Sequence, residues 1–420
     1  MLGFIIGAIK IIFILGFLIF IHEAGHFLIA KLCKIKVNEF AIGFGPTIWR
    51  KQGKETKYAL RLIPLGGFTS MEGEEERSDT EGSFSKASIP KRIAVVAAGG
   101  IVNIIFALIV YFVLISSTGN NVAPIIDNPI ENSNAQIAGI MSGDKIVKIN
   151  GKTIHYKSDL DEALEKCNGE NLKVVIERNG EEREFTFKPS EEKHNYTGIA
   201  ISASGEDNTK IAAIYPKSPA LMQGLEVNDL VLKVNGVDVQ GDSKKLVEQI
   251  NKEIGQEVQF NIQRGNDILD IKVSPEVHSQ YYLGVYLQRA ENNFGNNIYY
   301  AFWETGDFAF SIVDNLKLLF TGNVSIDQMM GPVGIGEVVA QTNGFADFIY
   351  ILALVSISLG FTNLLPFPPL DGGKIVILLV EAIRRKPMKE KTEITIQMVG
   401  FALLIGLSIY VTYNDILRIF

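Results

Sequence analysis

Four long apolar runs constrain the fold of this 420-residue chain more than any other feature of its sequence. They cover residues 2–21, 93–115, 348–370 and 394–413, and Lys10 is the one charged residue within them. Each run matches the ~20 residues that a helix needs to cross the hydrocarbon core of a bilayer. The sequence therefore predicts a multi-domain membrane protein with an α-helical transmembrane core of four spans.

Three prolines interrupt the third run near its C-terminal end: Pro366, Pro368 and Pro369. An unwound segment at membrane depth is tolerated only where protein or water satisfies the freed backbone groups. We therefore expect the end of the third span to be irregular and surrounded by other parts of the chain.

The distribution of basic residues predicts the orientation of the spans. Residues 31–92 contain 12 Lys and Arg and residues 374–391 contain six, whereas the two termini contain almost none. Short loops rich in Lys and Arg stay on the cytosolic side of a membrane. We therefore expect both basic loops in the cytosol, and both termini and the long segment 116–345 outside.

A histidine motif lies where the first run meets the basic loop, since residues 22–26 read His-Glu-Ala-Gly-His. Residues four apart share one face of a helix, so His22 and His26 can bind one metal ion, and Glu23 can act as general base on metal-bound water. Ionisable side chains are costly next to a bilayer and therefore indicate a functional site. The motif predicts a catalytic zinc site at the cytosolic end of the first span.

A catalytic zinc ion normally takes three protein ligands and a water molecule, so two histidines leave the site one ligand short. The other histidines all fall in the segment expected outside the cell: His155, His194 and His278. Spans one and three run in the same direction, so their C-terminal ends lie at similar depth. Asp371, just before Lys374, is therefore the expected third ligand beside His22 and His26.

The external segment repeats itself. Residues 133–154 align without gaps on residues 218–239 at an offset of 85, and residues 196–199 match residues 282–285 at an offset of 86. Each copy has a helical turn, a Gly, an Asp, an apolar strand and an Asn-Gly pair typical of a tight turn between strands. The repeat predicts two related α+β domains.

Each copy, at residues 120–205 and 206–290, resembles a PDZ domain of the bacterial, permuted type. PDZ domains bind extended peptides by strand addition and hold a C-terminal carboxylate on backbone amides. The resemblance implies grooves at which peptide or protein tails can bind. The alternative is a pair of generic small domains in which Asn150-Gly151 and Asn235-Gly236 are plain hairpin turns.

A more specific resemblance comes from residues 363–372, which read Asn-Leu-Leu-Pro-Phe-Pro-Pro-Leu-Asp-Gly. This stretch is similar to the second signature of the site-2 protease family of intramembrane metalloproteases, whose first signature is His-Glu-x-x-His. The order of spans, motifs and external repeat resembles the RseP-type bacterial branch over essentially the whole chain. The resemblance implies that His22, His26 and Asp371 bind Zn²⁺ and that Glu23 activates the water.

The resemblance also implies a location and a class of substrate. The chain is expected to be a multi-pass protein of the bacterial inner (plasma) membrane, with its active site near the cytosolic side. Its substrates would be single-span proteins, such as an anti-sigma factor or a remnant signal peptide, cut within their transmembrane segments. The PDZ-like pair would act as a size filter that admits substrates whose external domains have been removed.

Two asparagines are expected near the substrate or between helices. Asn363 can hydrogen-bond a substrate backbone or a developing oxyanion, or it can serve helix packing. Asn103 follows Gly99 by about one helical turn. It is interpreted first as support for the active-site helices and second as a substrate contact.

Two strands are predicted, residues 40–49 and 56–71, and Gly66 and Gly67 belong to an apolar stretch at residues 63–68 of the second. The resemblance implies that these strands form a membrane-associated β-hairpin near the active site. A strand edge there could pair with an unwound substrate and hold it extended. The alternative is a cytosolic hairpin with an apolar underside.

The remaining segments are expected to be simple. Charged side chains interrupt the aromatics after residue 292, which indicates an amphipathic external segment rather than a fifth span. Glu381 and Arg384 are interpreted as surface charges of a cytosolic loop, and the acidic residues 72–81 as a solvated loop. The expected segments are 1–31, 32–92, 93–115, 120–205, 206–290, 291–345, 346–373, 374–393 and 394–413.

Composition excludes one class of partner and leaves two rival functions. The formal net charge of -7 and the lack of a basic stripe interleaved with aromatics argue against nucleic-acid binding. The main alternative is a proteolytically inactive, membrane-anchored PDZ binding module. A metal transporter is the third reading, but transporters tend to repeat their spans, whereas here the external segment repeats. Cys33 and Cys167 are expected in different compartments and therefore unpaired.

Overall fold

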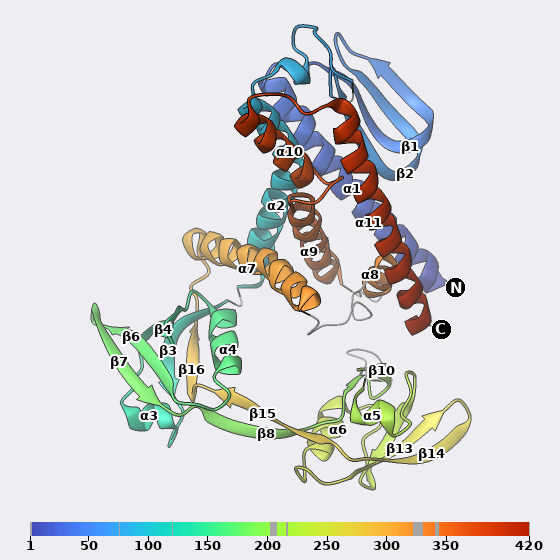
Figure 1. Cartoon of the computed structure of the whole chain (residues 1–420). Coiled ribbons are helices and arrows are strands. Elements are labelled where there is room, and N and C mark those ends of the chain that lie inside the picture. Colours follow the sequence, from blue (N-terminus) through green and yellow to red (C-terminus); the bar gives the residue numbers. More distant parts are fainter. Residues whose placement is uncertain are drawn as a thin grey trace. The chain divides into compact units, whose positions relative to one another are not determined.

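The computed structural model describes residues 2–74, 76–119, 121–201, 208–215, 217–321, 331–340 and 344–419. The chain divides into two compact units, which Figure 1 shows with their elements labelled. The first unit comprises residues 1–121 and 290–420 and contains the long helices. The second unit comprises residues 122–289 and contains most of the strands.

The first unit is built from seven described helices and one sheet. The helices are α1 (Leu2–Leu32), α2 (Ile89–Thr118), α7 (Phe294–Phe320), α8 (Pro332–Ala340), α9 (Phe345–Asn363), α10 (Asp371–Arg384) and α11 (Glu390–Ile419). The strands are β1 (Val37–Gln52) and β2 (Lys57–Met71), followed by a single 3-10 turn, η1 (Phe84–Lys86).

Four of these helices are long and apolar enough to cross a membrane. They are Ile9–Leu32, Ile89–Thr118, Phe345–Asn363 and Glu390–Leu417. An uninterrupted helix satisfies its own backbone hydrogen bonds, which hydrocarbon cannot do. The four helices agree with the four predicted spans, and the histidine motif lies inside α1 rather than beyond its end.

Helix α2 is the centre of the first unit, because α1, α7, α9 and α10 all pack against it. Small residues bring the backbones together. A Cβ atom on Gly25 would lie 2.7 Å from the carbonyl oxygen of Ala98, and one on Gly100 would lie 2.7 Å from that of Gly360. Helices in lipid associate through such close backbone contacts.

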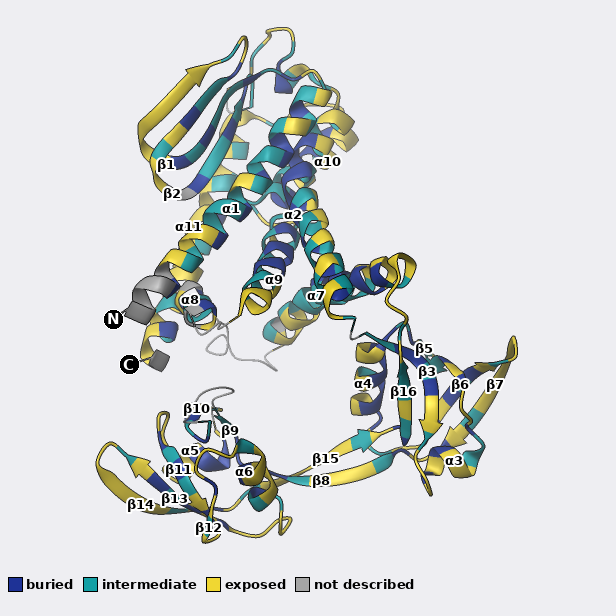
Figure 2. Ribbon diagram, turned by 180° about the vertical axis from the view of Figure 1, so that it is seen from behind, coloured by how far each residue is buried: buried dark blue, intermediate teal, exposed yellow. Residues whose placement is uncertain are grey.

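Helix α11 is the least covered of the four candidate spans. Its apolar window is 11% buried, against 28% to 44% in the other three. Figure 2 shows most of its surface as exposed, and many of these residues are large and apolar, such as Phe401, Leu403 and Ile409. An apolar surface of this extent is suited to contact with lipid.

The third apolar run is broken, as its prolines predict. Helix α9 ends at Asn363, residues 364–370 have no regular secondary structure, and α10 begins at Asp371. A Cβ atom on Gly372 would lie 2.1 Å from the carbonyl oxygen of Leu365, so only glycine fits beneath this irregular segment. Residues 374–393, predicted as a cytosolic loop, are largely helical, because the apolar residues after Lys374 continue α10 to Arg384 and α11 begins at Glu390.

The described part of the segment between the second unit and α9 contains α7 and α8, and α7 covers the stretch in which charged side chains interrupt the aromatics. Helix α7 packs against α2 and α9, and its Asn297 amide donates to Ser116 Oγ on α2 at 3.0 Å. Helix α8 packs against α1 and α11. The Asp415 carboxylate of α11 accepts hydrogen bonds from the backbone amides of Gly331 and Gly334, at 3.1 and 2.9 Å, at the N-terminal end of α8.

Strands β1 and β2 are long, bent and antiparallel. The first half of β1 pairs with both halves of β2, since Ala41 is the partner of Ala59 and of Phe68. The second half of β1 pairs back with the first half of β2. The sheet leaves large apolar side chains exposed, including Ile48 and Leu62, at 61% and 60%.

The second unit consists of two small cores. Its elements are β3 (Val122–Pro129), α3 (Asn134–Ala138), β4 (Lys145–Ile149), β5 (Lys152–Thr153), α4 (Lys157–Lys166), β6 (Leu172–Arg178), β7 (Glu181–Phe187), β8 (Ser190–Tyr196), β9 (Ile199–Ile201), β10 (Ile211–Ile214), α5 (Pro219–Met222), β11 (Leu230–Val234), β12 (Val237–Asp238), α6 (Ser243–Ile250), β13 (Val258–Arg264), β14 (Asp267–Val273), β15 (Glu276–Tyr282) and β16 (Val285–Arg289). The first core forms around the sheet β16-β3-β4-β6-β7, and the second around β12-β11-β13-β14.

The two cores exchange one segment each, so they do not divide the chain at a single point. Leu283 is buried in the first core and β16 pairs with β3, whereas Ile199 and Ile201 pack against the second core. The strands β8 and β15 pair with each other and carry the chain between the cores. This differs from the predicted boundary between residues 205 and 206, because a strand pairing between distant residues leaves no local signal in the sequence.

A buried ion pair recurs in both cores. Asp144 accepts two hydrogen bonds from Arg178, at 2.6 and 2.7 Å, and Asp229 accepts two from Arg264, both at 2.8 Å. Both carboxylates are almost fully buried, at 1% and 0% exposed. Removing one partner from a buried pair leaves an uncompensated charge.

We expect Asp144→Ala to destabilise the first core by about 2–3 kcal/mol, because the half-buried Arg178 and the Met141 amide then lose their charged acceptor. Backbone hydrogen exchange of residues 122–187 in the full chain measures this as faster exchange. Asp161→Ala is the control, since Asp161 is 54% exposed in a surface pair with Lys157. Equal exchange in the two variants contradicts the prediction.

The same pair predicts a dependence on pH. Burial opposes ionisation of Asp144, but hydrogen bonds from Arg178 and from the Met141 amide outweigh it and hold its pKa below the usual value. A carboxyl whose pKa is lower in the folded state stabilises the fold fully above its unfolded pKa, about 4. That stability is lost as the pH falls through the lower folded pKa.

Candidate metal centre

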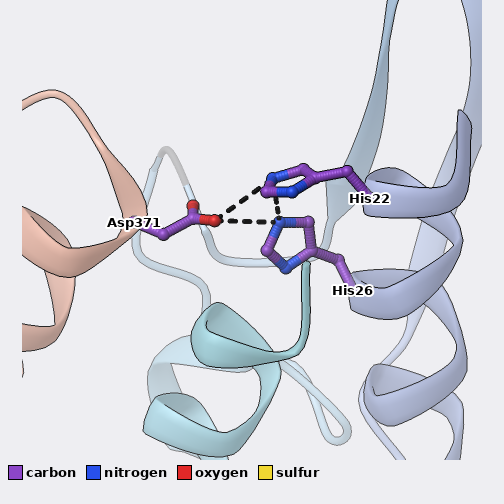
Figure 3. A group of neighbouring side chains, drawn as sticks. All are labelled: His22, His26 and Asp371. Carbon is purple, nitrogen blue, oxygen red and sulfur yellow. Dashed lines mark hydrogen bonds and ion pairs between the residues drawn. The ribbon is translucent and has the colours of Figure 1, made fainter. Parts of the chain in front are cut away.

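Three side chains from two helices converge at one point in the first unit (Figure 3). His22 and His26 stand one turn apart on α1, and Asp371 is the first residue of α10. The distance between His22 Nε2 and His26 Nε2 is 3.2 Å. Asp371 Oδ2 lies 3.2 Å from His22 Nε2 and 3.4 Å from His26 Nε2.

The spacing of these three atoms fits a zinc ion. A tetrahedral ion with bonds of roughly 2.0–2.1 Å holds its ligand atoms about 3.3 Å apart, which is the edge of the tetrahedron. Both histidines are 8% exposed, and Asp371 Oδ2 is buried without a hydrogen-bond partner among the described residues. The donor set, two imidazoles and a carboxylate, is one that catalytic zinc sites use.

The surroundings of His26 set the direction of its lone pair. Its Nδ1–H donates to the carbonyl oxygen of Val95 on α2 at 2.8 Å. A proton on Nδ1 leaves Nε2 free to bind a metal ion, and such a hydrogen bond also holds the ring in place. Helix α2 therefore contributes a backbone group to the site although it contributes no ligand.

Gly99 on α2 makes the space in which the imidazoles lie. A Cβ atom at this position would lie 2.4 Å from His26 Nε2 and 2.7 Å from His22 Nε2. No side chain fits at such distances without moving the histidines. The glycine therefore lets the α2 backbone form one wall of the site.

Glu23, the expected general base, lies beside the sheet. Its backbone carbonyl accepts a hydrogen bond from Thr69 Oγ1 of β2 at 3.0 Å. A Cβ atom on Gly67 would lie 3.4 Å from Glu23 Cγ and 2.8 Å from the Ala41 carbonyl oxygen. The structure thus brings Gly67 next to Glu23, as expected of a strand near the active site.

The other predicted residues have contacts or positions of their own in the structure. Gly66 has a positive φ of 108°, and a Cβ atom there would collide with the ring of Phe44. Asn103 is fully buried, and its backbone carbonyl accepts from Ser356 Oγ at 2.8 Å. Asn363 is the last residue of α9, and residues 364–370 separate it from Asp371, the first residue of α10.

Several contacts near the site were not predicted. Glu381 is 3% exposed and pairs with Arg92 and Arg77, so its interpretation as a surface charge is wrong. The loop at residues 72–81 is not simply solvated, because Glu74 pairs with Lys374 at 2.7 Å. A lone acidic residue within the apolar sequence of α10 was the signal that could have identified Glu381.

Comparisons with known proteins identify the family. The model of peptidase family M50 matches residues 10–407. The regulator of sigma E protease of Haemophilus influenzae is 29% identical, with 96% of each chain covered. The zinc metalloprotease RasP of Shouchella clausii is 30% identical over 97% of this chain and 98% of the relative. The regulator of sigma-E protease RseP of Escherichia coli is 28% identical, with 100% of each covered.

Solved structures give a more local likeness. The PDZ domain of HtrA3 bound to a phage-derived ligand is 27% identical over 21% of this chain and 92% of that domain, with a TM-score of 0.19. The family match, in contrast, spans the histidine motif, the second unit and Asp371. The chain therefore belongs to peptidase family M50, the site-2 proteases, and is a metalloprotease of the membrane.

Proposed function

We propose that this chain is an intramembrane zinc peptidase that cleaves single-span proteins within their transmembrane segments. The observation that carries the proposal is the triangle of His22 Nε2, His26 Nε2 and Asp371 Oδ2, with sides of 3.2 to 3.4 Å. His22 and His26 lie on α1, one of the helices that are long and apolar enough to cross a membrane, and Asp371 begins α10. Its size and donor set fit a catalytic zinc ion.

The proposed roles follow from the chemistry of each side chain. A zinc ion held by His22, His26 and Asp371 supplies a water of lowered pKa and a Lewis acid for the scissile carbonyl. Glu23 takes the proton of the attacking water and later passes it to the leaving amine. Asn363 is proposed to hydrogen-bond the substrate backbone or the developing oxyanion.

The sheet is proposed to hold the substrate extended. A helix hides its carbonyls in i→i−4 hydrogen bonds, so a substrate helix has to unwind before it is cut. Residues 67–71 of β2 pair with β1 on one side in the described part of the chain, and Gly67 lies beside Glu23. A substrate strand added to this edge would bring its peptide bond towards Glu23.

We propose the topology that the basic residues predict. The metal site then lies near the cytosolic side of a bacterial inner membrane, and both termini and the second unit lie outside. The exposed apolar side chains of β1 and β2, such as Ile48 and Leu62, support contact of this sheet with lipid.

The second unit is proposed to act on substrates before cleavage. A cavity of about 1530 Å³ is lined by α4, β8, β15 and residues 282–287. Its lining is mixed, with Leu160, Leu164, Leu283 and Val285 beside charged side chains such as Glu162 and Glu165. A groove between a helix and a strand is the kind of site at which PDZ domains take extended chains. We propose that this unit binds substrate tails or excludes substrates with large external domains.

The rival is an inactive, membrane-anchored binding module that uses the second unit alone. It does not account for three donor atoms at zinc spacing, a Val95 hydrogen bond on His26, and a glycine against both imidazoles. A buried carboxylate beside two imidazoles is costly unless it binds a cation.

Removal of zinc tests the proposal directly. We expect the purified protein to bind one zinc ion and to cleave a single-span substrate in detergent or liposomes. A chelator should abolish cleavage, and added Zn²⁺ should restore it. The substrate is used with and without a folded external domain, so that the same assay reports exclusion by size. A zinc-free, well-folded protein, or cleavage that persists after chelation, contradicts the proposed chemistry.

A further inference from the structure

Asp371 is the ligand whose position needs the most explanation. His22 and His26 stand in the long helix α1, but the seven residues before Asp371 have no regular secondary structure. The position of its carboxylate therefore depends on what holds α10, the helix that Asp371 begins.

Glu381 lies on α10 and is almost fully buried, at 3% exposed. Its Oε2 lies 2.9 Å from Arg92 Nη1, and its Oε1 lies 3.3 Å from Arg77 Nη2. The Met388 backbone amide also donates to Oε1, at 2.7 Å. Both carboxylate oxygens are thus satisfied by groups outside the helix.

The arginine partners connect α10 to the wall of the metal site. Arg92 lies in the first turns of α2, the helix that presents Val95 and Gly99 to the histidines. Apolar contacts follow the same path, since Leu378 of α10 is buried in one core with Val95 and Val96. Helix α10 is therefore joined to the N-terminal part of α2, which is also the part that contacts the two histidines.

A second set of contacts holds the first turn of α10. Lys374 is paired with Glu74 at 2.7 Å, and its ammonium lies 5.1 Å from the ring centre of Phe84. Arg92 lies 5.1 Å from the same ring centre. The loop that contains Glu74, Arg77 and Phe84 thus contacts α10 at both Lys374 and Glu381.

We propose that Glu381 is a positioning residue for the metal site: with Arg92 and Arg77 it holds α10 so that Asp371 reaches both histidines. The inference rests on the proposed zinc-dependent function. Glu381 is ten residues along α10 from Asp371, and its carboxylate contacts Arg92, Arg77 and the Met388 amide. It acts through the helix, in the way that groups behind a ligand commonly orient it.

Charge rather than shape is the property on which this role depends. A buried carboxylate is costly unless it is paired, and its removal leaves a cation without its partner. Gln has nearly the same shape as Glu but no charge, and it can accept one hydrogen bond at the same place. Glu381→Gln therefore loosens the attachment of α10 while it changes packing very little.

The experiment compares full-length wild type, Glu381→Gln and Arg384→Gln. Arg384 is an exposed charge on the same helix and serves as the matched control. We measure the rate of zinc loss to a chelator and the visible spectrum of the Co²⁺-loaded protein, which reports the ligand geometry. Changes behind a metal ligand typically reduce affinity 10- to 100-fold. We expect Glu381→Gln to lose zinc about tenfold faster and to alter the Co²⁺ spectrum, while Arg384→Gln matches wild type.

Wild-type zinc retention and an unchanged Co²⁺ spectrum in well-folded Glu381→Gln overturn the inference but leave the proposed function intact. A wild-type protein that binds no zinc overturns both. If Glu381→Gln does not fold, Arg77→Gln replaces it, because the Arg77 side chain is 39% exposed and its loss is milder. A severalfold faster loss of zinc is then expected, and loss at the wild-type rate overturns the inference.

Discussion

Glu23→Gln is expected to reduce peptide hydrolysis by about 10³-fold or more and to leave zinc bound. General acid–base catalysis commonly contributes about 10²–10⁴-fold, and Glu23 is proposed to serve both as base and as acid. The amide of Gln cannot accept the proton of the attacking water. Zinc content is expected to stay at the wild-type level, because the proposed ligands are His22, His26 and Asp371.

Single-turnover cleavage of a single-span substrate, measured together with zinc content, checks this prediction. Glu55→Gln is the control, because it makes the same substitution at a residue whose side chain is 49% exposed in a pair with Lys31. Exposed pairs contribute about 0–1 kcal/mol, so this variant should cleave normally. Cleavage at the wild-type rate in Glu23→Gln would remove Glu23 from the mechanism and leave another group as the base.

The spans and the metal site could be predicted because both depend largely on patterns among residues that are close in the sequence. An apolar run of 20 or more residues with at most one charge is long enough to cross a bilayer as a helix, so the four spans could be predicted from length and composition. His22 and His26 are four residues apart, a spacing that itself places them on one helical face. Asp371 required one further argument, that residues at equivalent ends of two spans share a depth.

Contacts between distant segments could not be predicted in this way. Glu381 and Arg92 are 289 residues apart, and their pairing depends on how α10 meets α2. The exchange of β16 into the first core is a pairing of the same kind, between Val285 and Pro129. In each case the sequence shows a residue or strand of the right type, but its partner is selected by tertiary packing.

The third span contains one feature that the sequence predicted and one that it did not. Pro366 and Pro368 predicted an unwound stretch, and α9 ends before them at Asn363. The return to a helix at Asp371 was not predicted, because Gly372 and Gly373 disfavour helix in sequence terms. The backbone carbonyl of Leu365 leaves no room for a side chain on Gly372. Glycine is therefore required here by a contact in the folded chain and not by the local helix conformation.

Gly99→Ala is expected to weaken zinc binding about 100-fold and to reduce cleavage in parallel, although it adds a single methyl group. The new Cβ atom would lie 2.4 Å from His26 Nε2 and 2.7 Å from His22 Nε2, so both imidazoles have to move. Metal ligands tolerate displacements of only about 0.2 Å. Helices α1 and α2 can separate instead only if they also open the contact of Gly25 with Ala98.

Zinc affinity measured by competition with a chelator checks this expectation, with Gly406→Ala as the matched control. Gly406 also lies in a candidate span, but a Cβ atom there meets nothing within 4 Å. Alanine is favoured over glycine in a helix interior by roughly 0.5–1 kcal/mol, so the control should fold at least as well as wild type and bind zinc normally. Wild-type zinc affinity in Gly99→Ala would show that the imidazoles are not confined by α2. Zinc affinity that falls about 100-fold in Gly99→Ala would show that the wall formed by α2 is as necessary to the site as its three ligands, because this variant leaves His22, His26 and Asp371 unchanged.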